Sequence, residues 1–285
     1  MHGKVILRLF LALVLTLAAA YYQRKTGPTY PIKGEQSWQG VQIKYTFARS
    51  HAGTGDQPVA ISVSDTTVKA MVIYRRLNSE DPWTGMVMKK GERGQYSASL
   101  PHQPAAGKIE YFILLNKQDR STVLPGNNSV VTRFKGEVPV AILLPHILFM
   151  FLAMLLSNAA GLEALVNGQL MNKFAFWATA GLFLGGMVLG PIVQKYAFGT
   201  YWSGIPFGYD LTDNKTLLSM LVWLIALWKG WSNRARRAWI IAAAIIIGVA
   251  IIVHGFLVRK RSSTLKPGDD KKASLEKPPK QLTKG

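Results

Sequence analysis

The pattern of charged and apolar positions divides this chain into a polar part and an apolar part. Charged residues are concentrated in positions 22–137 and 259–285, whereas between 138 and 258 they nearly vanish apart from short clusters. Soluble cores alternate apolar and polar positions, but segments that cross a bilayer do not. The pattern therefore predicts a polar globular domain followed by a membrane-embedded region.

The apolar region contains four segments with almost no charge. They are 138–157, 174–193, 216–228, whose helix is expected to start near Thr212, and 238–258. About twenty residues that rise about 1.5 Å each match the ~30 Å hydrocarbon core of a bilayer. We therefore expect a four-helix transmembrane bundle over residues 138–258.

The N-terminal residues 1–21 carry Lys4 and Arg8 before an apolar run, a pattern shared by cleaved signal peptides and uncleaved signal anchors. The alanines at 18–20 suit a signal peptidase, while the run that starts at Val5 is just long enough to cross a membrane. We favour an anchor, and the signal peptide remains the alternative. In either case the basic N-terminus stays in the cytoplasm and the next domain is exported.

The polar part contains short segments rich in β-branched and aromatic residues, separated by turns with Gly, Pro, Asn or Asp. These segments are 41–47, 58–63, 68–76, 85–90, 95–100, 108–115 and 129–134. Such a series of short strands predicts an antiparallel β-sandwich, which we place at 41–137. Glycines and prolines in 22–40, including Gly34, indicate a linker before it.

Three consecutive segments of this domain resemble a known kind of module. VKAMVIYRR is followed by DPWTGMVMKKGERGQYSASLP and then by GKIEYFILL. The same order of strand motifs is found in the immunoglobulin-like and fibronectin type III-like modules of bacterial surface proteins, and the resemblance covers roughly residues 58–134. It implies a binding or spacing module rather than a catalyst. As a whole the chain resembles uncharacterised bacterial integral membrane proteins with such an extracytoplasmic domain.

The net charge of +19 is spread over the polar domain, the short membrane loops and the tail, and no basic-aromatic nucleic-acid motif occurs. Basic residues beside membrane spans are typical of contact with anionic headgroups, so we expect no nucleic-acid partner. The basic cluster at 229–237 favours the cytoplasm, which places the β-sandwich outside the bacterial inner membrane. The basic tail at 259–285, expected to be disordered, conflicts with this topology, because five spans would place it outside.

Two histidines lie within the predicted spans at similar depths, His146 and His254. Ionisable groups in spans are uncommon, and two imidazoles on facing helices are able to ligate a haem b iron. The alternative, which we favour, is a histidine that bonds to a backbone carbonyl freed by Pro145 or to headgroups. Met150 and Met154 share a helical face with His146, which suits Cu(I) but is more typical of packing.

Small residues and aromatic residues mark two further candidate sites. Glycines spaced four apart predict close helix packing in the span 174–193, namely Gly181, Gly185, Gly186 and Gly190. The loop 194–216 is strongly aromatic and acidic, and its candidate ligand-pocket residues are Tyr201, Trp202, Tyr209, Asp210 and Asp213. The alternative is an interfacial aromatic belt, with Thr212 or Asp213 as the N-cap of the next helix.

No catalytic motif is found, and the chain contains no cysteine. We therefore expect a non-enzymatic, membrane-anchored binding or scaffolding protein, such as an accessory subunit of a membrane complex, whose outer domain contacts a protein partner. A haem- or quinol-binding redox subunit that uses His146 and His254 is the second hypothesis. A small-solute transporter is the third, disfavoured because the spans contain few polar residues.

Overall fold

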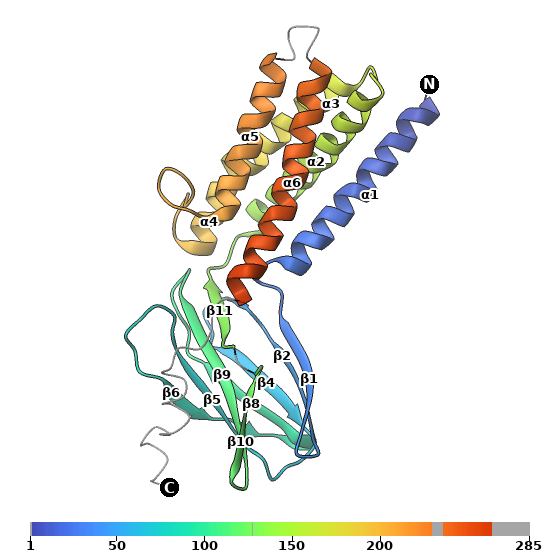
Figure 1. The fold of residues 1–285 in the computed structure, drawn as a ribbon. Helices are drawn as coiled ribbons and strands as arrows, with labels where there is room; N and C mark the ends of the chain where they lie inside the picture. Colours follow the sequence, from blue (N-terminus) through green and yellow to red (C-terminus); the bar gives the residue numbers. More distant parts are fainter. Residues whose placement is uncertain (1, 127, 230–235, 264–285) are drawn as a thin grey trace. The chain divides into compact units, whose positions relative to one another are not determined.

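The computed structural model describes residues 2–126, 128–229 and 236–263, with side chains up to residue 249 in the last helix. The chain forms two compact units (Figure 1). The first, here called the helical unit, contains Met1–Gly27 and Glu137–Val258. The second, the β unit, contains Pro28–Gly136. The expected combination of a β-rich domain and a set of helices is therefore confirmed, and each part is described by itself below.

The β unit consists of two sheets. The first has the order β1-β2-β4-β8-β7 and is antiparallel throughout. Its strands are β1 (Ile32–Trp38), β2 (Val41–Phe47), β4 (Gln57–Val63), β7 (Lys89–Lys90) and β8 (Gln95–Leu100), with a short 3₁₀ turn at Glu92–Gly94. The second has the order β3-β11-β9-β5-β6, and β10 also pairs with β9. Its strands are β3 (Ser50–Ala52), β5 (Lys69–Arg76), β6 (Thr84–Val87), β9 (Lys108–Lys117), β10 (Arg120–Leu124) and β11 (Val130–Lys135).

A single apolar core lies between the two sheets. Along β2 and β4, buried and exposed positions alternate, as expected for strands with one face turned to a core. Both sheets contribute fully buried side chains to the same cluster, among them Phe47, Ile61, Tyr111 and Phe134. The β unit is therefore a sandwich of two antiparallel-rich sheets, and among its described strands only β3 and β11 pair in parallel.

The predicted linker at 22–40 is wrong. Helix α1 continues to Thr26, and β1 occupies Ile32–Trp38 and pairs with β2 along its whole length. Gly34, interpreted from the sequence as a breaker, lies against the ring of Tyr45 on β2, where any Cβ would collide with that ring. This glycine is therefore compatible with an edge strand, because it leaves room for an aromatic cross-strand neighbour.

The segment 85–90, predicted as one strand, is divided between the sheets. β6 pairs with β5 in the second sheet, whereas β7 pairs with β8 in the first. The change of sheet occurs at Met88, whose side chain is buried and whose N–H donates to the carbonyl of Ala70. Two short strands, β3 and β10, were not predicted. Both add to strands already formed, so their pairing depends on tertiary contacts and not on local pattern.

The helical unit contains α1 (His2–Thr26), α2 (Val140–Leu165), α3 (Met171–Leu182), α4 (Gly190–Phe198), α5 (Leu211–Lys229) and α6 (Arg236–Ser263). A π-helical segment, Phe183–Leu189, joins α3 to α4 without a break. Among the described residues, three helical stretches are long and apolar enough to cross a membrane: Gly3–Thr26, Val140–Leu165 and Met171–Phe198. Membrane association is thus plausible for this unit.

The remaining two predicted spans differ from these three. The first turns of α5 carry Asp213, Asn214 and Lys215, which lower the hydropathy of that helix. In α6 the side chains beyond Val249 are outside the described residues, and so is the predicted tail from 264 onward. Both α2 and α6 extend further than expected, by about two turns and one turn respectively. Helices of the unit lie side by side in Figure 1, and small residues such as Ala160 and Ala178 are buried between them.

Helix α1 is held to α2 by two polar contacts at different depths. The guanidinium Nε of Arg8 lies 2.6 Å from Oε1 of Glu163, and Glu163 is almost completely buried. Farther along, the amide of Asn158 donates to the hydroxyl of Thr16 over 2.9 Å. The start of α1 therefore lies beside the end of α2, and the two helices run antiparallel.

Candidate functional site

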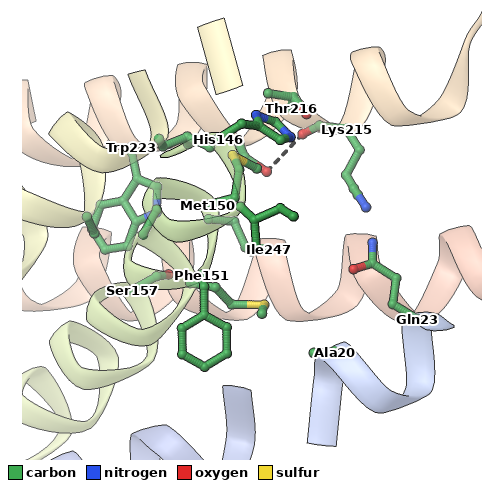
Figure 2. Close-up of a pocket in the computed structure, with 16 residues that line it drawn as sticks. Ala20, Gln23, His146, Met150, Phe151, Ser157, Lys215, Thr216, Trp223 and Ile247 are labelled. Carbon is green, nitrogen blue, oxygen red and sulfur yellow. Dashed lines mark hydrogen bonds between the residues drawn. The ribbon is translucent and has the colours of Figure 1, made fainter. Parts of the chain in front are cut away.

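A cavity of about 330 Å³ lies within the helical unit and is the strongest candidate for a binding site there (Figure 2). Side chains from α1, α2, α3, α5 and α6 line it. They are Ala20, Gln23, His146, Ile147, Met150, Phe151, Ala153, Met154, Ser157, Ala178, Leu182, Lys215, Thr216, Ser219, Trp223 and Ile247. The volume is at the lower end of the range that small-molecule sites occupy, and the walls are mainly apolar, as in most such sites.

The polar groups of the cavity are distributed unevenly. Lys215 and Gln23 come from the start of α5 and the end of α1, and in Figure 2 their terminal groups point toward one another. No hydrogen bond or ion pair joins either terminal group to a described residue. About three turns farther along α2 from His146, Ser157 has a buried hydroxyl that likewise has no hydrogen-bond partner among the described residues. The cavity thus has a cationic end and a mainly apolar remainder, in which Ser157 has the hydroxyl without a described partner.

His146 is fixed by a backbone contact. Its Nδ1 lies 2.9 Å from the carbonyl oxygen of Gly185, which also accepts the N–H of Gly190. Because a carbonyl only accepts, Nδ1 carries the proton in this contact. Gly185 lies in the π-helical segment, and such segments are frequent at functional sites. His146 thus bonds to a backbone carbonyl, but this carbonyl belongs to Gly185 in the π-helical segment and is not the one that Pro145 was expected to free on α2.

The other metal and cofactor candidates lie as follows. Met150 and Met154 line the cavity together with His146, as their shared helical face predicts. His254 belongs to α6, but its side chain is outside the described residues, so its distance from His146 is not defined. No group of three His, Cys, Asp or Glu side chains able to hold a metal ion occurs in the described part of the chain.

The four glycines lie where helices approach closely. A Cβ on Gly185 would lie 2.9 Å from Cβ of Phe149 on α2, and a Cβ on Gly186 would lie 2.7 Å from Cγ2 of Thr216 on α5. Gly181 faces Ala153 of α2 at 3.4 Å. A Cβ on Gly190 would lie 3.4 Å from the carbonyl oxygen of Gly185. The π-helical segment is therefore packed between α2 and α5, and it brings the carbonyl of Gly185 to His146.

The aromatic loop before α5 is organised by its two aspartates. Oδ1 of Asp210 accepts the backbone N–H groups of Thr212 and Asp213, so Asp210 caps α5, and not Thr212 or Asp213 as expected. Asp213 is buried, and its Oδ2 accepts the N–H and the hydroxyl of Ser203 at 2.7 and 3.2 Å. Both carboxylates are thus occupied within the loop itself.

The aromatic residues of this loop do not line the cavity. The side chains of Tyr201 and Tyr209 are exposed, the latter to 90%. The indole N–H of Trp202 donates to the carbonyl of Ile205 over 3.1 Å. This arrangement resembles the interfacial aromatic belt that the sequence offered as the alternative to a ligand pocket.

Two residues of the helical unit were not singled out from the sequence. Lys215 was noted only as part of the loop, although a lysine one turn inside an apolar helix is unusual in itself. Ser157 was not considered, because one serine in an apolar segment carries no signal until its environment is known. Only the packing of five helices shows that the two line one cavity.

Comparisons with known proteins leave the family open. No protein-family model matches the chain, and no curated protein matches it. Among solved structures, the chain is similar to a family 76 glycoside hydrolase from a bovine Bacteroides thetaiotaomicron strain, with 13% sequence identity and a TM-score of 0.24. The match covers 75% of this chain and half of that protein. A likeness this distant carries no argument about fold or activity.

Proposed function

We propose that this chain is a membrane-anchored binding or scaffolding protein of a bacterial cytoplasmic membrane, whose β unit is an immunoglobulin-like or fibronectin type III-like module for a protein partner. The observation that carries the proposal is the separate construction of the two units. The β unit has its own apolar core, and the helical unit provides three helical stretches with the length and hydropathy of membrane spans.

The strand order supports the assignment of the β unit to this class of module. In immunoglobulin-type sandwiches one sheet contains strands A, B and E, and the other contains C, F and G. Here β2, β4 and β8 are neighbours in one sheet, and β11, β9 and β5 are neighbours in the other. Taken in chain order, β2, β4, β5, β8, β9 and β11 correspond to A, B, C, E, F and G of that scheme.

Basic side chains at one end of the helical unit support an orientation in which that end faces the cytoplasm. Arg8 at the start of α1 pairs with Glu163 at the end of α2, and Arg237 at the start of α6 donates to the carbonyl of Leu165. Lys4 belongs to the same end of α1. Concentrated Lys and Arg favour the cytoplasmic side. The end of α1 and the start of α2 both lie away from this basic end of the helical unit. The β unit comes between these two points in the sequence.

The orientation is tested by labelling of single cysteines, which the absence of native cysteine makes simple. Ser62→Cys lies on the outer face of the first sheet, and Gln169→Cys lies in the turn between α2 and α3. A membrane-impermeant maleimide added to intact spheroplasts should label only the variant at position 62. Labelling of the position-169 variant alone would overturn the topology.

The partner hypothesis is tested on a shallow depression in the first sheet. Lys33, Glu35, Lys44 and Ser62 contribute to it, and Lys44 and Glu35 form an exposed ion pair of 3.1 Å. A photo-crosslinking residue at Lys44 should capture a defined second chain in cells, and the same group at Gln118 in the β9–β10 turn serves as the control. Equal capture at both positions, or none at either, contradicts the proposal.

A further inference from the structure

The cavity of the helical unit combines a cation with an apolar wall, and no described carboxylate forms an ion pair with that cation. Lys215 lines the cavity at its polar end, and no described carboxylate lies within ion-pair distance of its ammonium. A charged group beside apolar surface is costly unless a counter-charge or a hydrogen-bond acceptor faces it. The site is therefore complementary to an anionic group.

The wall next to Lys215 is suited to a hydrocarbon chain. Trp223, almost completely buried, lies two turns farther along α5, and Met150 and Phe151 face the same space from α2. The eight residues between Lys215 and Trp223 correspond to a rise of about 12 Å, so the apolar part extends well beyond the reach of the cation. Methionine adapts its shape to irregular apolar groups, and this suits a flexible chain more than a rigid ring.

The polar groups of the cavity would set the direction in which an elongated ligand lies in it. At the cationic end, the amide of Gln23 faces Lys215 (Figure 2) and adds a donor that no described residue uses. Farther from Lys215, the buried hydroxyl of Ser157 has no hydrogen-bond partner among the described residues, whereas the hydroxyls of Thr216 and Ser219 donate to carbonyls of their own helix. A molecule with a charged head and an apolar tail satisfies both ends, because its head meets the donors and its tail fills the wall.

We propose that this cavity binds one acyl chain together with its anionic head, supplied by a fatty carboxylate or by an anionic phospholipid. Lys215 contacts its anionic head, and the wall formed by Met150 and Trp223 encloses its chain. His146, whose ring is fixed by the carbonyl of Gly185, forms part of the wall. This inference concerns the helical unit alone, so it does not depend on the partner proposed for the β unit.

The test uses the full-length protein in an uncharged detergent and a terminally brominated dodecanoate, whose bromine quenches tryptophan fluorescence on contact. The wild-type chain should show saturable quenching that Trp223→Phe reduces. The methyl ester of the same acid has no charge and should bind at least tenfold more weakly. Lys215→Met should weaken carboxylate binding by about 10- to 100-fold, the range expected for a charge-assisted contact.

Two controls separate the site from general effects. Lys215→Arg keeps the charge and should retain binding within a few-fold, and Lys229→Met removes a lysine from the other end of α5 and should leave binding unchanged. Ala178→Phe fills the cavity and should abolish quenching, while thermal unfolding of each variant verifies the fold. Native mass spectrometry of the protein extracted from membranes distinguishes a retained fatty acid from a retained phospholipid by mass.

Equal affinity for the acid and its ester, or equal binding by wild type and Lys215→Met, overturns the proposal. The absence of saturable quenching in the wild-type chain overturns it as well, since it indicates a cavity filled by water.

Discussion

The contact between Arg8 and Glu163 offers the sharpest test of how the helical unit is built. Oε1 of Glu163 lies 2.6 Å from the guanidinium, and Oε2 has no hydrogen-bond partner among the described residues. The side chain of Glu163 is 1% exposed and that of Arg8 is 19% exposed. Arg8→Met removes the cation while keeping most of the apolar stem, so it leaves a buried carboxylate without a counter-charge.

The free-energy cost of Arg8→Met follows from the burial of the Glu163 carboxylate. Removal of one member of a buried ion pair costs about 3–5 kcal/mol, because the remaining charge has been taken out of water without compensation. Arg8 is partly exposed and water reaches that end of the pair, so we expect a value near the lower bound, about 3 kcal/mol. That is roughly a 150-fold change in the unfolding equilibrium. The double variant Arg8→Met/Glu163→Gln has no buried charge and should lie within about 1 kcal/mol of the wild type.

The measurement is the free energy of unfolding of the full-length protein in micelles, from far-UV circular dichroism during titration with sodium dodecyl sulfate. Lys4→Met is the matched control, because it removes the same charge from an exposed position on the same helix. The reasoning is refuted if Arg8→Met costs no more than Lys4→Met, or if the double variant shows the sum of the two single effects.

The same pair bears on the fate of the N-terminal segment. Cleavage after Ala20 would separate Arg8 and Thr16 from their partners on α2. We therefore expect the mature protein to retain α1 as an anchor, and the intact mass of the purified chain checks this directly.

Two further predictions concern the packing of helices and the acid stability of the β unit. Gly185→Leu should destabilise the helical unit by about 1–3 kcal/mol in the same titration, because the new side chain enters the contact with Phe149. In the β unit, the hydrogen bond from Lys117 and those from Thr67 lower the pKa of Asp65 from 3.8 to about 2. A folded-state pKa below the unfolded value contributes stability that is present above the unfolded value and is lost as the pH falls toward about 2, so Asp65→Asn should flatten this acid decline.

Each of these predictions has a control in the chain. Gly248 on α6 has open space around its Cβ position, so Gly248→Leu should leave stability nearly unchanged or raise it slightly. A cost at Gly248 equal to that at Gly185 contradicts the packing argument. Asp119→Asn removes an exposed carboxylate from the β9–β10 turn and should keep the wild-type pH profile in urea titrations of the β unit. If the stability of Asp65→Asn depends on pH in the same way as that of the wild type, the role of Lys117 is contradicted.

Local pattern in the sequence was sufficient for most secondary structure. Strands β2 and β8 begin and end at the predicted residues, because alternation of buried and exposed positions is a property of the strand itself. The apolar runs at the N-terminus, in α2 and in the stretch 171–198 likewise indicated helices of spanning length, since composition over about twenty residues is a local signal.

Tertiary structure alone decided which distant residues meet. Arg8 and Glu163 are separated by 155 positions, and the spacing along either helix contains no information about the other. Gly34 marks a strand and not a linker because the ring of Tyr45 occupies the space that a side chain would need. Lys215 and Ser157 become parts of one cavity only when α2 and α5 pack, since an unpaired polar group is recognised by its surroundings and not by its sequence neighbours.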